Sequence, residues 1–168
     1  MNHKMIGKII SLILLVEAAF LLPGMGLCLA DGDMDAALAF IYTIGITGVV
    51  SGALALWSRN TPRGFYAREG MVCVGMSWLF MSLLGCLPFF LSGEIPNYID
   101  ALFEMVSGFT TTGASILSDV EALPRGILLW RSFSHWIGGM GVLVFLLAIV
   151  PISGRSDGFT MHLLRAES

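Results

Sequence analysis

The sequence predicts an all-α membrane protein with four transmembrane helices and one short re-entrant helix between the third and the fourth. Hydrophobic residues make up 56% of the 168 residues and charged residues only 12%, about half the charged share of an average soluble domain. The charges are clustered. They leave four apolar stretches of roughly 22–24 residues, each long enough to cross about 30 Å of hydrocarbon as a helix. We therefore expect a multi-pass membrane protein surrounded by lipid.

The first predicted span, roughly residues 6–30, has Glu17 as the only charged residue between Lys8 and Asp31. A secretory signal is the competing interpretation. The apolar run is long for a signal core and continues through Pro23 without a clear small-x-small cleavage site, so we expect a retained helix. Intramembrane carboxylates are often functional, but we interpret Glu17 as a structural hydrogen-bonding residue rather than as part of an ion pathway.

The other predicted spans cover roughly residues 36–58, 70–91 and 126–151. Basic residues precede the first span, join the second to the third and follow the fourth, whereas acidic residues dominate the remaining connections. The positive-inside rule then places both termini in the cytoplasm. Arg125 and Arg131, at the outer start of the fourth span, are exceptions that either snorkel to the interface or pair with nearby carboxylates.

A short helix of about ten residues is predicted over residues 98–108, because Pro96 and Asn97 offer a turn and an N-cap. It is too short to cross the membrane. The third span nevertheless ends, and the fourth span begins, on the outer side of the membrane. A re-entrant hairpin satisfies both conditions. Non-helical backbone at membrane depth is tolerated only where protein buries it or where it lines a wet cavity.

The loop after this helix reads T-T-T-G-A, residues 110–114. Its carbonyls and hydroxyls can replace the water around a dehydrated cation, and Gly113 permits backbone angles that a side chain would forbid. The C-terminal end of the short helix carries about half a negative charge, which favours a cation. An ordinary extracellular loop is the alternative, but the hairpin topology favours a pore helix followed by an extended filter loop.

Other residue types give weaker indications. The fourth span contains a glycine cluster, Gly138, Gly139 and Gly141. No strand precedes it, so it is not a nucleotide-binding loop. We interpret it as allowing the fourth span to approach the hairpin closely. The cysteines lack C-x-x-C spacing and are interpreted as apolar packing residues; they are Cys28, Cys73 and Cys86. His135 has no second histidine or cysteine at ligand spacing, so a metal site is not supported. Ser107 and Ser134 have no histidine–carboxylate partners, so we do not expect an enzyme. No nucleic-acid partner is expected.

These motifs resemble the first pore repeat of the Trk/Ktr/HKT superfamily of potassium uptake proteins, most closely its bacterial TrkH type. The resemblance covers most of residues 1–168. The matching segments are Arg68-Glu69-Gly70, A-L-F-E-M-V-S-G-F-T-T-T-G-A-S at 101–115, Leu123-Pro124, Trp130-Arg131-Ser132, H-W-I-G-G-M-G at 135–141, Ala148-Ile149-Val150-Pro151 and Leu164-Arg165-Ala166-Glu167.

In such proteins four helix–pore–helix repeats surround one pore, with two extra helices before the first. The resemblance therefore implies three parts: two N-terminal transmembrane helices in residues 1–66, the first repeat in residues 67–153 and a cytoplasmic segment in residues 154–168. It implies potassium transport across a bacterial inner membrane, with potassium as the only cofactor and one quarter of the filter in this chain.

By the same resemblance, Thr111 and Thr112 offer the potassium-binding oxygens and Gly113 is the filter glycine. Thr110 and Ala114 complete the filter stretch, Ser115 belongs to its outer end, and Glu104 braces it from behind. The T-T-G-A sequence lacks the tyrosine and second glycine of the T-V-G-Y-G filter of potassium channels, which implies a less rigid and less selective filter.

The resemblance also implies partners. Family members are several times longer, so we expect a fragment or a truncated product that needs the remaining pore repeats or further copies of itself. A homodimer and a cytosolic nucleotide-binding regulatory subunit are further implied partners. The alternative function is a truncated, non-conducting membrane scaffold that only binds other helices.

Overall fold

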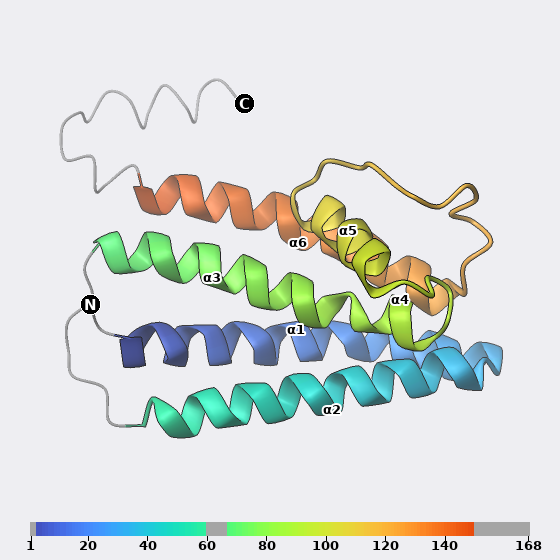
Figure 1. The fold of residues 1–168 in the computed structure, drawn as a ribbon, viewed down its shortest axis with the longest axis horizontal. Helices are drawn as coiled ribbons and strands as arrows, with labels where there is room; N and C mark the ends of the chain where they lie inside the picture. Colours follow the sequence, from blue (N-terminus) through green and yellow to red (C-terminus); the bar gives the residue numbers. More distant parts are fainter. Residues whose placement is uncertain (1–2, 60–66, 150–168) are drawn as a thin grey trace.

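The computed structural model describes residues 3–59 and 67–149, and these residues form helices and loops without a strand (Figure 1). The helices are α1 (His3–Asp31), α2 (Met34–Trp57), α3 (Ala67–Gly85), α4 (Leu87–Leu91), α5 (Tyr98–Phe109) and α6 (Arg125–Ile149). The predicted all-α class is thus confirmed. The proposed cytoplasmic segment, residues 154–168, lies outside the described residues.

Three segments of the described chain are long and apolar enough to cross a membrane: His3–Asp31, Met34–Trp57 and Val72–Leu91. They coincide closely with the first three predicted spans. The fourth predicted span corresponds to α6, which has 25 residues but is not among these three segments. A count of four transmembrane helices therefore stays a prediction.

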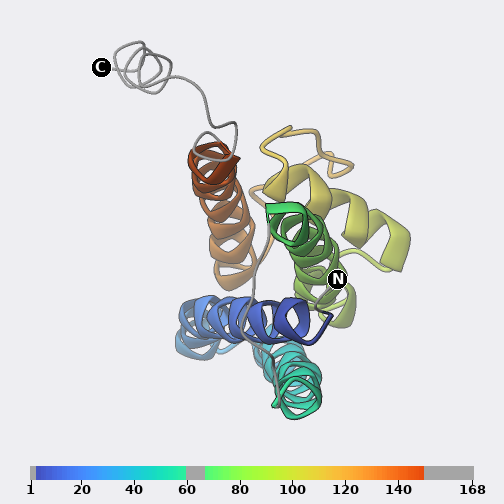
Figure 2. The same ribbon diagram turned by 90° about the vertical axis from the view of Figure 1, so that its left-hand side faces the viewer.

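Helices α1 and α2 form an antiparallel pair joined by a tight turn. Gly32 has a φ of +77° in this turn, and the Asp33 side chain caps α2 by accepting a hydrogen bond from the Ala36 amide at 3.1 Å. Farther along the pair, the Ser51 hydroxyl donates to the Ser11 carbonyl at 2.8 Å. Viewed along the helices, α1 lies between α2 on one side and α3 and α6 on the other (Figure 2).

The third predicted span is broken near its outer end, a feature the sequence pattern did not predict. Helix α3 ends at Gly85, and the short helix α4 begins at Leu87 with Pro88 in its first turn, where the missing proline N–H interrupts the helical hydrogen bonds. Two side chains from later elements bond to carbonyls at the break. The Trp130 indole donates to the Gly85 carbonyl at 2.8 Å, and the Tyr98 hydroxyl donates to the Leu83 carbonyl at 2.9 Å. The break thereby becomes the point where α5 and α6 attach.

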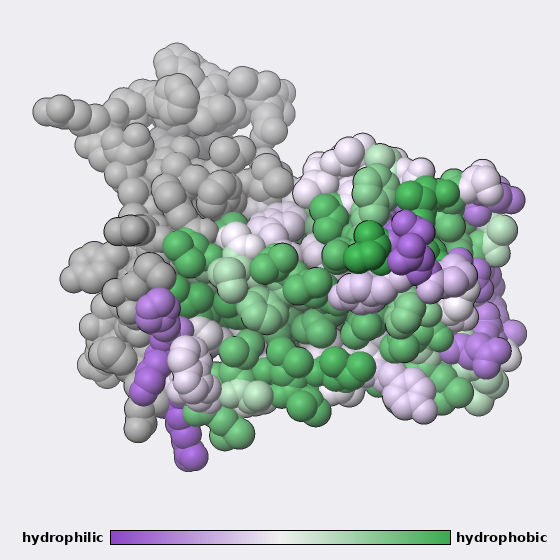
Figure 3. All heavy atoms as spheres, in the orientation of Figure 1, coloured by the Kyte–Doolittle hydropathy of each residue, from purple (hydrophilic) through white to green (hydrophobic). Residues whose placement is uncertain are grey.

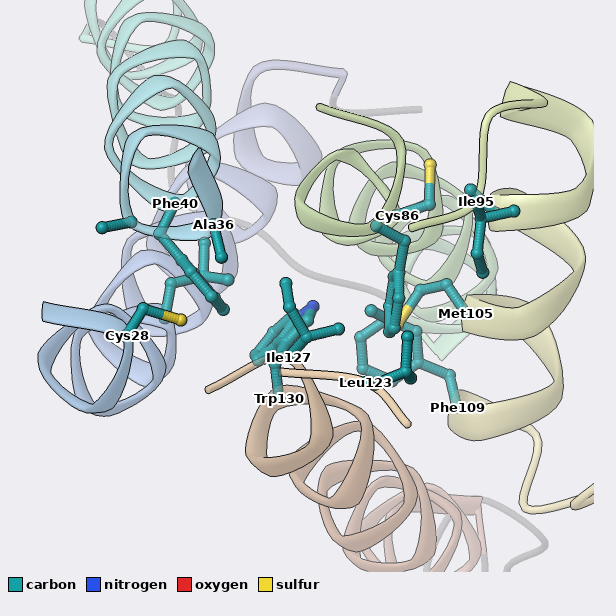
Figure 4. Close-up of a cluster of buried hydrophobic side chains, with 14 residues drawn as sticks. Cys28, Ala36, Phe40, Cys86, Ile95, Met105, Phe109, Leu123, Ile127 and Trp130 are labelled. Carbon is teal, nitrogen blue, oxygen red and sulfur yellow. The ribbon is translucent and has the colours of Figure 1, made fainter. Parts of the chain in front are cut away.

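The main apolar core lies where α1, α2, α4, α5 and α6 meet, with partly buried residues of α3 packed against it (Figure 4). Phe109 and Trp130 are completely buried there, in an edge-to-face contact with ring centroids 6.5 Å apart. Trp78 also packs against Phe109, with ring centroids 6.0 Å apart and the same edge-to-face geometry. Such aromatic contacts add about 0.5–1.5 kcal/mol each beyond the burial of their area. As predicted, the cysteines are free and buried; they are Cys28, Cys73 and Cys86.

The outer surface of the helices is strongly apolar. Hydrophobic residues gather along the middle of the helices and hydrophilic residues lie toward their two ends (Figure 3). Large exposed side chains on α1 and α2 include Leu12, Leu15, Val16, Ile41 and Val49. A soluble protein seldom exposes a continuous apolar surface of this kind, so the surface fits a protein whose helices face lipid.

Candidate functional site

Helix α5 begins where the sequence predicts and ends one residue later than predicted. Asn97 is its N-cap, and its side chain accepts a hydrogen bond from the Ile99 amide at 3.0 Å. The helix packs against α3 and α6. Its buried residues include Ala101, Glu104 and Ser107. We call α5 together with the T-T-T-G-A loop (residues 110–114) the α5 hairpin.

Glycines let α6 approach the end of α5 until their backbones touch. A Cβ atom added at Gly138 would overlap the carbonyl of Phe109, and one added at Gly108 would overlap the hydroxyl of Ser134. A Cβ atom added at Gly141 would meet the Trp78 ring, whereas one added at Gly139 would make only an ordinary contact with Thr111 Cγ2 at 3.9 Å. Close approach of α6 to the hairpin through the glycine cluster is therefore confirmed for Gly138, whereas Gly141 lies against α3.

The backbone of the T-T-T-G-A loop is held by the last turn of α5. The amide of Thr110 donates to the Val106 carbonyl at 2.9 Å, and the amide of Thr112 donates to the Ser107 carbonyl at 3.0 Å. Thr111 has a φ of +55° and Gly113 a φ of +75°. A threonine in this left-handed region costs about 1–2 kcal/mol, and residues held in such conformations gather at functional sites.

Side-chain hydrogen bonds divide the loop carbonyls into two groups. The Ser107 hydroxyl donates to the Ala114 carbonyl at 2.6 Å, and the Thr111 hydroxyl donates to the Thr110 carbonyl at 2.7 Å. Between these two, the carbonyls of Thr111, Thr112 and Gly113 accept no hydrogen bond from any described residue. Three successive carbonyl oxygens are thus available on an exposed loop whose two ends are fixed.

The threonine hydroxyls are engaged within the hairpin. Thr110 donates its hydroxyl to the Val106 carbonyl at 2.8 Å and lies 2.8 Å from the hydroxyl of Thr112. An oxygen that takes part in a hydrogen bond keeps a lone pair, so the hydroxyl of Thr112 can still act as an oxygen ligand. The hydroxyls therefore brace the loop and leave the three carbonyls as its least engaged oxygens.

Glu104 lies behind the loop as the centre of a hydrogen-bond network. Its carboxylate is 1% exposed. Its Oε1 atom accepts from Arg131 Nε at 2.7 Å, and its Oε2 atom accepts from the Ile116 amide at 3.2 Å. The Ser115 hydroxyl lies 3.0 Å from both carboxylate oxygens. This network ties the segment that follows the loop to both α5 and α6.

Sequence reasoning missed two residues of this site. Ser107 was considered only as a nucleophile, yet it bonds to the loop through its carbonyl and its hydroxyl. Arg131 was left between snorkelling and pairing, and the structure shows that it pairs with Glu104. The signal for Arg131 was a cation inside an apolar segment, which requires a nearby carboxylate. Arg125 also pairs, with Asp31 at 3.1 Å, although both side chains are partly exposed.

Nitrogen, sulfur and carboxylate ligands do not assemble at this site. Among the described residues, no three His, Cys, Asp or Glu side chains gather in a way that could hold a metal ion. His135 instead lies with Nδ1 2.9 Å from the Arg131 carbonyl, one turn earlier in α6. The hairpin offers neutral oxygens, which suit a weakly held monovalent cation.

The sequence matches one family of membrane transport proteins over most of its length. The TrkH family model, described as a cation transport protein, matches residues 37–167. The TrkH potassium uptake protein of Halomonas elongata is 34% identical over 157 residues, covering 92% of this chain and 32% of that protein. The TrkH of Escherichia coli is 37% identical over 172 residues, covering 99% of this chain and 34% of that protein.

A solved structure agrees with these matches. The crystal structure of the potassium transporter TrkH from Vibrio parahaemolyticus superimposes with a TM-score of 0.81 at 30% identity. The match covers 94% of this chain and 34% of that one. The chain thus spans about a third of the length of the relatives it matches.

Proposed function

We propose, from the premise that this chain belongs to the TrkH family of cation transport proteins, that its T-T-T-G-A loop forms one quarter of the filter of a potassium transporter. One observation carries the proposal. The carbonyls of Thr111, Thr112 and Gly113 have no hydrogen-bond donor among the described residues, while the carbonyls on either side of them are held. A row of such oxygens replaces the hydration shell of a potassium ion.

The geometry supports distinct roles for the predicted site residues. Thr111, Thr112 and Gly113 supply ion-binding oxygens, and the left-handed φ angles at 111 and 113 set the direction of the backbone. The carbonyls of Thr110 and Ala114 accept hydrogen bonds and fix the ends of the loop. Glu104 and Ser115 support the hairpin from behind. Transport of this kind requires no chemical change in the ion, so the protein acts as a transporter and not as an enzyme.

A single loop contributes ligands from one side only, so the ring of oxygens requires other loops. Relatives about three times as long are named potassium uptake proteins. The missing sides of the filter therefore come from further pore repeats or from further copies of this chain. In this proposal residues 1–66 supply two supporting helices and residues 67–153 supply the first repeat.

The remaining proposals concern surroundings and partners. The apolar outer surface and the basic residues at one end fit a bacterial inner membrane, with both termini in the cytoplasm. A second copy of the complete protein, in a homodimer, and a cytosolic nucleotide-binding regulatory subunit are the further partners that we propose from the family resemblance. Potassium is the cargo and the only ion required.

Growth of a potassium-uptake-deficient bacterium on limiting potassium tests the function. The chain is expressed alone and as a chimaera in which it replaces the corresponding third of the Escherichia coli TrkH. Each version is compared with its Gly113→Asp variant, which places a carboxylate among the ion-binding carbonyls. Gly93→Asp is the matched control, because Gly93 also has a positive φ (+81°) and open space at its Cβ position.

We expect the chimaera to restore growth and Gly113→Asp to reduce potassium uptake at least tenfold, while Gly93→Asp leaves uptake close to that of the parent. Rescue by the chain alone would show that copies of it assemble into a pore. A chimaera that works equally well with Gly113→Asp would contradict the assignment of the filter. Failure of the chimaera despite correct insertion would favour the non-conducting scaffold.

A further inference from the structure

Glu17 is a buried carboxyl group that the proposed filter does not use. It is the middle residue of α1 (His3–Asp31), so it lies about 21 Å from either end of the helix at 1.5 Å per residue. It is 1% exposed, and neither of its carboxylate oxygens has a hydrogen-bond partner among the described residues. The structural hydrogen bond expected from the sequence is therefore not found, and the depth of the group prevents it from reaching the interface.

The carboxyl faces the point where the α5 hairpin attaches to the rest of the molecule. A Cβ atom added at Gly85 would lie 2.7 Å from Oε1 of Glu17, and 3.2 Å from the ends of the Met105 and Trp130 side chains. Met105 and Trp130 come from α5 and α6 and point toward one another beside Cys86 (Figure 4). Glu17 thus contacts the break of α3 that holds the hairpin in place.

No described cation is placed to balance a negative charge at Glu17. On α6, Arg131 is committed to Glu104 of α5 at 2.7 Å, and Arg125 pairs with Asp31 at the outer end. Among the other described basic side chains, His3, Lys4, Lys8 and Arg59 lie near the opposite ends of α1 and α2. On α6, His135 has Nδ1 2.9 Å from the Arg131 carbonyl.

Three further groups complete the surroundings of Glu17. The titratable group near it on the α3–α4 connection is the thiol of Cys86. On α2 the buried polar groups at this depth are Thr43 and Thr47, because the bond between Ser51 and Ser11 sets the antiparallel register and places both within about one turn of Glu17. The Thr43 hydroxyl donates to the Ala39 carbonyl at 2.7 Å, and the Thr47 hydroxyl is buried without a partner among the described residues. None of these groups carries a positive charge that could offset a carboxylate.

An isolated carboxylate in such a place is very unfavourable, and the usual outcome is that the group becomes neutral. We propose that Glu17 is a proton-binding site: it takes one proton from water and keeps it at neutral pH, and the neutral carboxyl packs behind the α5 hairpin. The ligand is a proton rather than a metal cation, since few oxygens converge on Glu17. This inference stands independently of the proposed filter.

Proton binding by Glu17 links the stability of the fold to pH. Above about pH 4.3 a glutamate in the unfolded chain is ionised, while Glu17 in the folded chain still holds its proton. The folded state then binds more protons than the unfolded state, so stability falls as the pH rises. The folding equilibrium constant falls tenfold per pH unit, about 1.4 kcal/mol, relative to a variant with no titratable group at this position.

Infrared spectroscopy of the 168-residue chain in lipid nanodiscs tests the proposal directly. A protonated carboxyl has a carbonyl stretching band that an ionised carboxylate lacks. We expect this band at pH 7.5 in the wild-type chain and in Glu94→Gln, a control change at an exposed carboxyl, and not in Glu17→Gln. If Glu17→Gln fails to insert, Glu17→Met replaces it with a side chain of similar volume.

Unfolding measurements between pH 5.5 and 7.5 supply the second readout. The ratio of the folding constants of Glu17→Gln and wild type should rise about 100-fold over these two units. Absence of the band from the folded wild-type chain, its persistence in Glu17→Gln, or a ratio independent of pH would each overturn the proposal. Those results would mean that the carboxylate is ionised and has a partner.

Discussion

The ion pair between Glu104 and Arg131 can be tested by replacing each residue with glutamine, singly and together. The pair joins α5 to α6 directly behind the T-T-T-G-A loop, with Nε and Oε1 2.7 Å apart. Both single changes remove one charge and keep the approximate size of the side chain. The double variant removes both charges, so the cycle isolates the interaction between them.

The expected size of the interaction follows from burial. A hydrogen bond to a charged group contributes about 1.5–3 kcal/mol. The Glu104 side chain is fully buried, but the Arg131 side chain is 19% exposed and partly screened by solvent. We therefore expect a coupling energy near the lower end of this range, about 1.5 kcal/mol.

The two single variants should differ in cost. Glu104→Gln leaves Arg131 without its carboxylate and replaces one acceptor oxygen by an amide donor, which faces either the arginine or Ser115 and Ile116. We expect it to cost about 2–3 kcal/mol of stability, below the 3–5 kcal/mol typical of a fully buried pair. Arg131→Gln should cost more, since the charged Glu104 carboxylate is fully buried and keeps only the neutral donors Ser115 and Ile116, whereas the arginine is partly exposed to solvent.

The assay is unfolding of the chain in lipid-detergent micelles, followed by loss of helical circular dichroism, with Glu94→Gln as a control for removing a carboxylate at an exposed position. A coupling energy below about 0.5 kcal/mol, the usual limit for independent sites, would refute the reasoning. It would mean that the contact does not hold α5 against α6.

Two further predictions concern the hairpin itself. Ser107→Ala removes the 2.6 Å hydrogen bond to the Ala114 carbonyl and should cost about 1 kcal/mol of stability. It should also lower the preference of the chimaera for potassium over sodium in competitive uptake assays. An unchanged preference would show that this bond does not shape the loop. Gly138→Ala forces a Cβ atom onto the Phe109 carbonyl and should cost about 1–3 kcal/mol in the same unfolding assay. Gly139→Ala should cost much less, because its Cβ atom would only contact Thr111 Cγ2 at 3.9 Å; equal effects of the two changes would contradict the close contact between α5 and α6.

Much of the fold could be predicted because its signals are local. The lengths of the apolar stretches set the spans, and Asn97 marked the start of α5 within the sequence itself. The break of α3 before Pro88 was missed, although proline is a local signal. Near the end of a transmembrane span, a proline is equally compatible with the helix simply ending there. The distinction depends on whether Trp130 and Tyr98 are present to bond to the carbonyls at the break.

The candidate site shows the same division. Residues 110–114 were selected from their own composition, and the role of Glu104 came from a resemblance. Which loop carbonyls are free could not be predicted, because this depends on whether the Ser107 hydroxyl turns toward Ala114. The absence of a described partner for Glu17 could not be predicted either, since it depends on the side chains that the neighbouring helices place around it.

The sequence by itself determined that this chain is a helical membrane protein with a short helix and an oxygen-rich loop between two long apolar segments. Those features follow from hydrophobic length and backbone propensity, which act over a few neighbouring residues. Only the tertiary structure decided that Arg131 holds Glu104 from 27 residues away and that Glu17 is enclosed behind the hairpin. Charges inside an apolar bundle need partners, and which partners they find depends on how the helices pack.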